Sequence, residues 1–267
     1  MRPLVSPNNK DVLLPPVHPN RGVEVAYRNR LLKLVDEMHE SLLYWLTAAY
    51  RANSPELAQD DSPASGLTRA MRRLARRWQR KFDKSSEKRA ERFADEAMGA
   101  ADSALKENLR KKGFSVRFSM SREANDVYRA TIAENVGLIR SIASEHLDKV
   151  QGLVMRSVTQ GRKLDELTVE LAKRYAITKK RAAFIARDQN NKATAVITRV
   201  RQRELGITQA RWMHSAGGKE PRPSHVAANG KLYDIDKGMY LDGEWIRPGE
   251  LPNCRCVSQS VIPGFEE

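Results

Sequence analysis

Glycine and proline divide this sequence at Gly206. Beyond that residue the two residue types interrupt the chain every few positions, at Gly217, Gly218, Pro221, Pro223, Gly230, Gly238, Gly243, Pro248, Gly249 and Pro252. Proline breaks the interior of a helix and glycine weakens it, so helices of normal length are excluded from residues 207–267. Short apolar pieces at 210–213, 231–235 and 256–261 predict a small, loop-rich β module there.

Before Gly206, apolar residues recur every three or four positions, which is the spacing of one helix face. The first predicted helix covers 23–53, with an apolar face made of Tyr27, Leu31, Leu34, Val35, Met38, Leu42, Trp45, Leu46 and Ala49. A second helix is predicted from Leu67 to Leu109, with Gly113 ending it and a hinge at Ser85 and Ser86. Its apolar face is made of Leu67, Met71, Leu74, Trp78, Phe82, Phe93, Met98, Leu105 and Leu109.

The rest of the helical region is predicted to hold one strand and three helices. Residues 114–120 alternate apolar and polar side chains, a period of two that indicates a short half-buried strand. A long helix is expected over 127–158 and a short one over 164–175. Thr178 is then a candidate N-cap for a further helix that runs to Gly206.

The fold class that follows is mainly α, an extended helical body with a small C-terminal loop-rich α+β module. Residues 1–22 carry Pro3, Pro7, Pro15, Pro16 and Pro19 and are expected to form an extended arm without regular structure. The chain then divides into an N-terminal helical region (23–120), a helical core (121–206) and the Gly/Pro-rich β module (207–267).

The charge of the chain points to polyanionic partners. The formal net charge is +14 and the isoelectric point about 9.9, which produces a field that attracts nucleic acid or an acidic protein surface. No apolar run is long enough to span a membrane, and the first 20 residues lack the apolar core of a secretory signal. We therefore expect a cytoplasmic protein, or one assembled into a structure built there, with no membrane partner.

The densest positive charge lies on the second predicted helix. Eight residues form the candidate nucleic-acid-binding set: Arg69, Arg72, Arg73, Arg76, Arg77, Arg80, Lys81 and Lys84. On one face of a helix they could meet successive phosphates of double-stranded DNA without reading its sequence. The alternative is a solvated helix face with no partner.

The only two cysteines, Cys254 and Cys256, lie two residues apart. Residues at that spacing on a strand point to the same side, so both thiols could share a zinc ion with His225. His214 or Asp234 could supply a fourth ligand. The alternative is a pair of packed thiols, because structural zinc sites usually have a longer cysteine spacing.

The order of residues in the C-terminal part resembles the signature of the phage Mu F-like minor head proteins. The residues that carry this resemblance are Trp212, Arg222, Pro223, His225, Gly230, Pro252, Asn253, Cys254 and Cys256. The resemblance covers roughly residues 125–260. It implies a structural role in phage head morphogenesis, with association with the portal and the capsid or scaffold proteins, and contact with packaged DNA in the virion. It implies no catalytic residue.

Two other functions fit parts of the sequence. A metal-dependent nuclease or toxin-like enzyme would use His225, Asp234 and the two cysteines, although acidic residues in Gly-rich loops more often make turns. A host nucleoid-associated DNA-binding protein would fit the charge. It would not explain the C-terminal module, so the structural head protein is the preferred interpretation.

Overall fold

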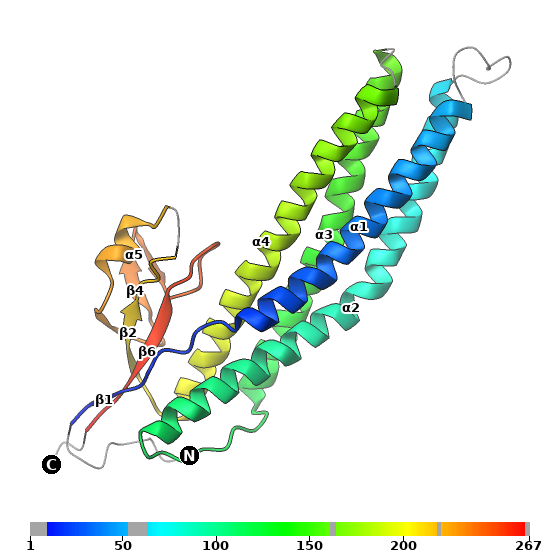
Figure 1. The fold of residues 1–267 in the computed structure, drawn as a ribbon. Coiled ribbons are helices and arrows are strands. Elements are labelled where there is room, and N and C mark those ends of the chain that lie inside the picture. Colours follow the sequence, from blue (N-terminus) through cyan, green and yellow to red (C-terminus); the bar gives the residue numbers. More distant parts are fainter. Residues whose placement is uncertain (1–9, 53–62, 161–163, 218–219, 265–267) are drawn as a thin grey trace. The chain divides into compact units, whose positions relative to one another are not determined.

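Four long helices follow a short N-terminal strand and precede the remaining strands in the computed structural model, which describes residues 10–52, 63–160, 164–217 and 220–264 (Figure 1). The long helices are α1 (Arg21–Ala52), α2 (Pro63–Lys111), α3 (Arg122–Thr159) and α4 (Leu164–Glu204). Beyond α4 the described chain holds one helix, the five-residue α5 (Pro223–Ala227). The predicted fold class, mainly α with a small α+β module, is confirmed.

The chain forms two compact units built from segments distant in sequence. The helix unit comprises Ala26–Glu91 and Ala133–Ala186. The module unit comprises Met1–Val25, Arg92–Ile132 and Arg187–Glu267, so it contains the C-terminal module together with parts of the long helices.

In the helix unit, the apolar faces read from the sequence are buried. Seven of the nine residues predicted for the first helix face are buried in α1, whereas Trp45 is 49% exposed. Polar contacts add to this packing: the Trp78 indole N–H donates to Ser41 Oγ (3.1 Å) and the Tyr27 hydroxyl donates to Asn135 Oδ1 (2.9 Å).

Two predicted interruptions of the helices are absent. Helix α2 runs continuously through Ser85 and Ser86, and the Ser86 hydroxyl donates to the carbonyl of Asp83 at 2.9 Å. The predicted helix start at Thr178 is wrong, since α4 is continuous there. Thr178 is buried within the helix, its hydroxyl donates to the Arg174 carbonyl one turn earlier (3.0 Å), and its side chain bonds His146 Nδ1 (2.8 Å). A Thr in that arrangement bonds inside a helix instead of capping one.

Helix α4 ends where the sequence predicts. Gly206 has a φ of 72°, in the left-handed region that glycine adopts without strain. The N–H groups of Gly206 and Ile207 bond the carbonyls of Arg203 (2.9 Å) and Gln202 (2.9 Å), which closes the last turn.

The module unit contains an antiparallel sheet in the order β1-β6-β2-β3. Its strands are β1 (Val12–Leu13), β2 (Gln209–Met213), β3 (Leu232–Asp234) and β6 (Val257–Ile262). Strands β2, β3 and β6 confirm the three predicted β pieces. A separate hairpin, β4 (Met239–Leu241) and β5 (Glu244–Ile246), was not predicted.

The N-terminal arm takes part in this sheet. Val12 and Leu13 pair with Ile262 and Val261 of β6, and the Leu14 N–H donates to the Ser260 carbonyl at 3.1 Å. The prediction that the arm holds no regular structure is therefore wrong at β1, because a pairing 250 residues away in sequence leaves no local signal. Pro3 and Pro7 lie outside the described residues.

The strand predicted at 114–120 does not form. Phe114, Val116 and Phe118 are half-buried while the residues between them are exposed, so the alternation correctly predicts the burial of these side chains. Met120 is 55% exposed. The segment pairs with no strand in the described chain, and the Ser119 carbonyl instead accepts a hydrogen bond from Arg201.

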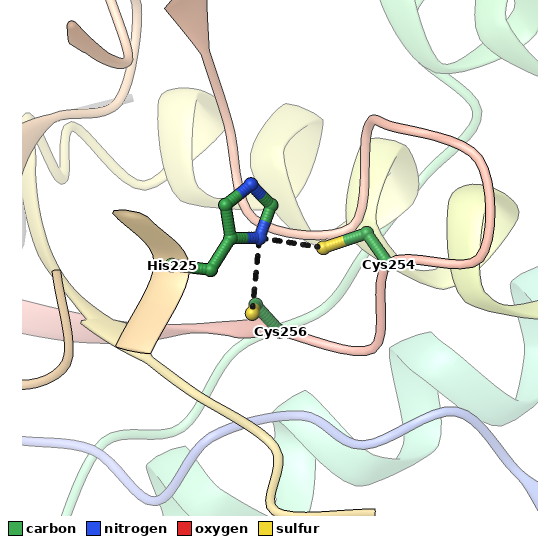
Figure 2. Close-up of side chains that lie close together, drawn as sticks. All are labelled: His225, Cys254 and Cys256. Carbon is green, nitrogen blue, oxygen red and sulfur yellow. Dashed lines mark hydrogen bonds between the residues drawn. The ribbon is translucent and has the colours of Figure 1, made fainter. Parts of the chain in front are cut away.

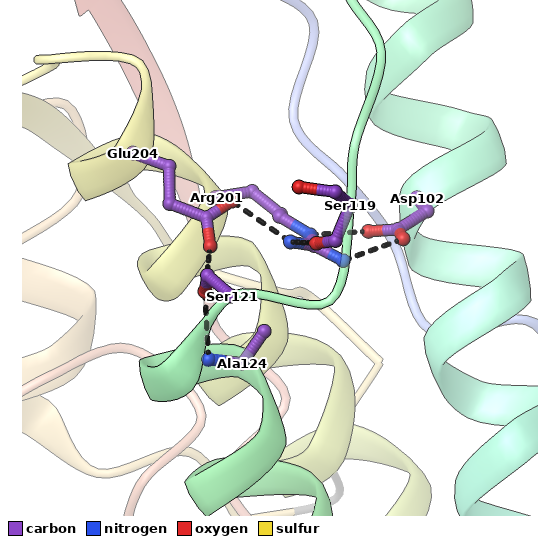
Figure 3. Close-up of polar contacts among 6 residues, drawn as sticks. All are labelled: Asp102, Ser119, Ser121, Ala124, Arg201 and Glu204. Carbon is purple, nitrogen blue, oxygen red and sulfur yellow. Dashed lines mark hydrogen bonds and ion pairs between the residues drawn. The ribbon is translucent and has the colours of Figure 1, made fainter. Parts of the chain in front are cut away.

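Arg201 of α4 ties three parts of the module unit together (Figure 3). Its side chain is 3% exposed and makes a two-pronged ion pair with Asp102 of α2 (2.8 and 2.9 Å). It also donates to Glu204 Oε2 (2.8 Å) and to the Ser119 carbonyl (2.8 Å). Burial lowers the pKa of Arg201, but the hydrogen bonds to Asp102 and Glu204 outweigh burial and raise it.

Candidate metal centre and candidate nucleic-acid interface

His225 is placed by the short helix α5. Pro223 opens this helix, where a residue without an N–H costs nothing, and the N–H groups of His225 and Val226 bond the Arg222 carbonyl (3.1 Å each). The buried Trp212 of β2 packs edge-on against the imidazole, with ring centroids 5.0 Å apart. The imidazole ring is thereby held facing the loop that carries the cysteines.

Polar side chains of α4 hold the cysteine loop. Asn253 has a φ of 60°, a conformation that asparagine tolerates, and its N–H donates to Asp188 Oδ1 (2.6 Å). Arg187 donates to the Asn253 side-chain oxygen (3.2 Å), and Asn191 donates to the Cys254 carbonyl (3.2 Å). These hydrogen bonds therefore fix the loop without any contribution from the two thiols.

The three predicted metal ligands converge (Figure 2). Nδ1 of His225 lies 3.5 Å from Cys254 Sγ and 3.6 Å from Cys256 Sγ. The three ligand atoms lie within 4.8 Å of one another, and all three residues are at most 4% exposed. The cluster belongs to the core of the C-terminal module together with Trp212 and Tyr233.

The two thiols share one environment that favours a single negative charge. A hydrogen bond from the Cys256 thiol lowers the pKa of Cys254, against the effect of burial, and backbone N–H groups of Cys256 and Gly249 add to the lowering. The same hydrogen bond raises the pKa of Cys256, as does burial. The pair therefore loses a first proton more readily than a second.

Of the two candidates for a fourth ligand, the structure brings His214 to the cluster. His214 Nδ1 lies 3.6 Å from Cys256 Sγ, and its backbone is fixed by a hydrogen bond to Asn229 Oδ1 (2.9 Å). Asp234 is used differently: its carboxylate accepts the N–H groups of Asp236 (2.8 Å) and Lys237 (2.9 Å). The hydrogen bond from the Lys237 N–H is the main cause that lowers the pKa of Asp234. The bond from the Asp236 N–H adds to the lowering, and burial opposes it.

A cavity of 710 Å³ opens beside the cluster and is lined by His214, His225 and both cysteines, together with Arg187, Arg222 and Arg255 among others. Each of the three arginines is already hydrogen-bonded: Arg187 to Asn253, Arg222 to the Pro252 carbonyl (3.1 Å), and Arg255 to the Gly217 carbonyl. Asp234 does not line this cavity. The residue set expected for a nuclease is thus not assembled around His225.

All nine motif residues lie in the module unit, and most of them bond or pack around this cluster. Gly230, with a φ of 78°, turns the chain after α5, and its N–H donates to the Trp212 carbonyl at 2.7 Å. The Pro252 carbonyl accepts a hydrogen bond from the Arg222 side chain, and Asn253 precedes Cys254 in the loop.

The eight candidate nucleic-acid-binding residues share the exposed side of α2 in the helix unit. All eight, Arg69, Arg72, Arg73, Arg76, Arg77, Arg80, Lys81 and Lys84, are exposed. Lys81 is paired with Glu37 (2.7 Å) and lies over the Trp78 ring (4.5 Å). Within the described ranges, six of the set have no ion-pair partner: Arg72, Arg73, Arg76, Arg77, Arg80 and Lys84.

The sequence reasoning missed the polar face of α4 that supports the site. Asp188, Asn191 and Gln202 are buried, and Gln202 donates to Ser258 (3.1 Å) and Ser260 (2.8 Å) of β6. The run Asp188–Gln189–Asn190–Asn191 in an otherwise regular helix was an available signal, because short polar residues are disfavoured inside helices unless they bond elsewhere.

Comparisons with known proteins agree with the motif. Residues 148–259 match the family described as Phage Mu protein F like protein. An uncharacterized protein of Haemophilus influenzae is 36% identical over 138 residues, which is 52% of this chain and 30% of that protein. The chain thus spans less than a third of the length of this relative. No solved structure matches the chain.

Proposed function

From the match of residues 148–259 to the phage Mu F-like family, we propose that this chain is a structural minor head protein that acts in phage head morphogenesis. Its expected partners are the portal and the capsid or scaffold proteins. Its place is then the virion head, and the host cytoplasm during assembly. No described helix is long and apolar enough to cross a membrane.

The observation that carries this proposal is the use of the motif residues. His225, Cys254, Cys256 and Trp212 pack together in the core of the C-terminal module. Arg222 and Asn253 tie the surrounding loops, through bonds to Pro252 and to Asp188. Residues used to hold a small module together are what a structural protein needs.

The assembly role has a direct test in a phage that encodes this chain. Mass spectrometry of purified heads should find the protein, and a stop codon early in its gene should give particles that lack it and package DNA poorly. Heads that contain none of the chain in the unmutated phage would overturn the proposal.

DNA contact is the second part of the proposal, and the basic face of α2 supports it. Residues 69–84 span about 22 Å at 1.5 Å per residue, and duplex DNA carries one phosphate per roughly 1.7 Å of axis. Six cations with no ion-pair partner in the described chain repel one another unless a counter-charge binds. A phosphate backbone supplies that counter-charge without requiring any base contact.

The salt dependence of DNA binding tests this surface. Replacing Arg72, Arg73, Arg76, Arg77, Arg80 and Lys84 with Gln should flatten the slope of log K against log salt by up to about 5, since each phosphate contact contributes about 0.9. A matched control replaces Arg92, Arg110 and Lys111, which are exposed on α2 but paired with acids, and should leave the slope nearly unchanged. An unchanged slope in the six-residue variant would mean that this face of α2 is solvated and does not bind DNA.

The enzymatic alternative needs a separate assay. We expect the purified chain to shift plasmid DNA in a gel without nicking it when Mg²⁺, Mn²⁺ or Zn²⁺ is added. Nicking that disappears in His225→Ala would replace the structural role by a nuclease.

A further inference from the structure

The cysteine and histidine cluster goes beyond the head protein role, and we propose that it is a structural zinc site with four protein ligands: His214, His225, Cys254 and Cys256. The ion would tie together β2, α5 and the loop before β6, which are distant in sequence.

The distances within the cluster are those of a tetrahedral zinc site. Zinc bonds of about 2.3 Å to sulfur and 2.05 Å to nitrogen, at tetrahedral angles, place nitrogen and sulfur about 3.6 Å apart. His225 Nδ1 lies 3.5 and 3.6 Å from the two sulfurs, and His214 Nδ1 lies 3.6 Å from Cys256 Sγ. Three nitrogen–sulfur distances among these ligand atoms therefore already have the required value.

The choice of zinc follows from the ligand types. Two thiolates and two imidazoles are the soft and borderline donors that zinc takes in four-coordinate structural sites, whereas Mg²⁺ and Ca²⁺ require oxygen ligands. Binding would hold both sulfurs as thiolates. The metal-ligand cluster found in the described chain consists of His225, Cys254 and Cys256 and holds no carboxylate, and His214 reaches it through Cys256.

Simple packing of two thiols explains the arrangement less well. An apolar core does not require polar ligand atoms from three separate segments to converge, yet His225 turns Nδ1 to both sulfurs while Trp212 covers its ring. The core of the C-terminal module is small: its buried apolar members are Ile207, Ala210, Trp212, Ala228, Tyr233, Ile235, Ile246, Val257, Val261, Ile262 and the two cysteines. Cores of that size usually depend on an added tie such as a metal.

His214 makes the site closed. With only His225 and the cysteines, a zinc ion would keep one open position, as catalytic sites do. With His214 as the fourth ligand, that position is filled and the site is structural. His214 is only half-buried, so changing it should disturb the apolar packing little.

The test uses the full chain purified without chelators. Elemental analysis should give close to one zinc per chain, and Co²⁺ exchanged for the zinc should show the intense visible bands of a tetrahedral ion together with thiolate charge transfer. Less than a tenth of an equivalent of zinc, with no uptake of added Zn²⁺ or Co²⁺ by the folded protein, would overturn the site.

Three variants identify the ligands. His214→Ala should weaken zinc binding at least tenfold and change the Co²⁺ spectrum while the far-ultraviolet circular dichroism is kept. Asp234→Asn, the rejected fourth ligand, and His18→Ala, an exposed histidine of the arm, should bind zinc as the unchanged chain does. If His214→Ala keeps both the affinity and the spectrum, the four-ligand assignment is wrong.

Cys256→Ser should lose the zinc and the thermal transition of the C-terminal module. Since Cys256 is buried, this variant could unfold for lack of packing alone. Treating the unchanged chain with a chelator separates the two causes. Removal of zinc should lower the midpoint temperature of the same transition, and added Zn²⁺ should restore it. An unchanged midpoint temperature after the chelator has removed the zinc would contradict a structural role. Failure of this site would leave the head protein proposal standing, because that proposal depends on phage heads and not on metal.

Discussion

Removing Asp102 should destabilise the module unit far more than removing a similar acid on its surface. Asp102→Ala leaves the guanidinium of Arg201 buried at 3% exposure with only Glu204 and the Ser119 carbonyl as partners. Breaking a buried ion pair from one side costs about 3–5 kcal/mol, and the 17% exposure of the Asp102 side chain reduces this to about 2–4 kcal/mol.

The matched control is Glu123→Ala. Glu123 pairs with Arg203 at 2.7 Å, but both side chains are more than 40% exposed, and Arg203 retains Asp236 at 3.1 Å. Exposed pairs contribute about 0.2–1 kcal/mol. The two variants therefore differ in burial while sharing the same chemical change.

Urea unfolding followed by circular dichroism is the appropriate assay, because urea carries no charge and does not screen ion pairs. With a slope of about 2 kcal/mol per molar, the midpoint should fall by about 1–2 M for Asp102→Ala and by less than about 0.5 M for Glu123→Ala. Equal shifts would refute the argument that burial makes the Arg201 network strong.

Two further predictions concern His146 and Gly249. Burial is the main cause that lowers the pKa of His146 to about 4, and the charge of Arg174 is the second. The pKa of this histidine in the unfolded chain is near 6.5, so as the pH falls the unfolded chain binds the proton first. The free energy of unfolding is therefore highest above pH 6.5 and should fall by up to about 3 kcal/mol as the pH drops toward 4. His146→Gln should remove most of that part of the pH dependence in urea midpoints, and an identical profile for the variant would contradict it. Gly249 has a φ of 83° and a Cβ there would lie 2.8 Å from the Ala195 Cβ, whereas Gly113 has a φ of 85° with open space around it. Gly113→Ala should therefore cost only the backbone strain, about 1–2 kcal/mol, and Gly249→Ala at least about 1 kcal/mol more by thermal unfolding.

Local patterns in the sequence predicted the features that depend on local order. Helix faces with a spacing of three and four gave the buried sides of α1 and α2, and the spacing of glycine and proline gave the end of α4 at Gly206. The hairpin β4–β5 was within reach of the same reasoning. Asp242 and Gly243, with φ values of 52° and 90°, form the Asp-Gly turn that marks a two-residue hairpin between apolar pieces.

Other features depend on partners far away in the sequence. The alternation at 114–120 predicts which side chains are half-buried, but a local pattern cannot supply a strand to pair with. From the sequence, Arg201 is expected to be an exposed helix residue. Its burial depends on the fold, which places Asp102, 99 residues away in sequence, beside it. The convergence of His225 with the cysteines was expected from the motif alone, while the choice between His214 and Asp234 required the turn that occupies Asp234.

The basic face and the family match lie in different parts of the chain. Residues 69–84 belong to the helix unit and fall outside the matched residues 148–259, whereas the cysteine and histidine cluster falls within them. The proposal of DNA contact therefore does not follow from the family match and depends on the charge and exposure of α2 alone. Because no side chain is shared between the basic face and the cluster, changes at one should leave the other intact: the six-residue Gln variant should keep its zinc, and the chelated protein should keep its salt-dependent binding to DNA. A loss of DNA binding on chelation would show that the DNA surface includes the C-terminal module, and the assignment of DNA contact to α2 would then be wrong.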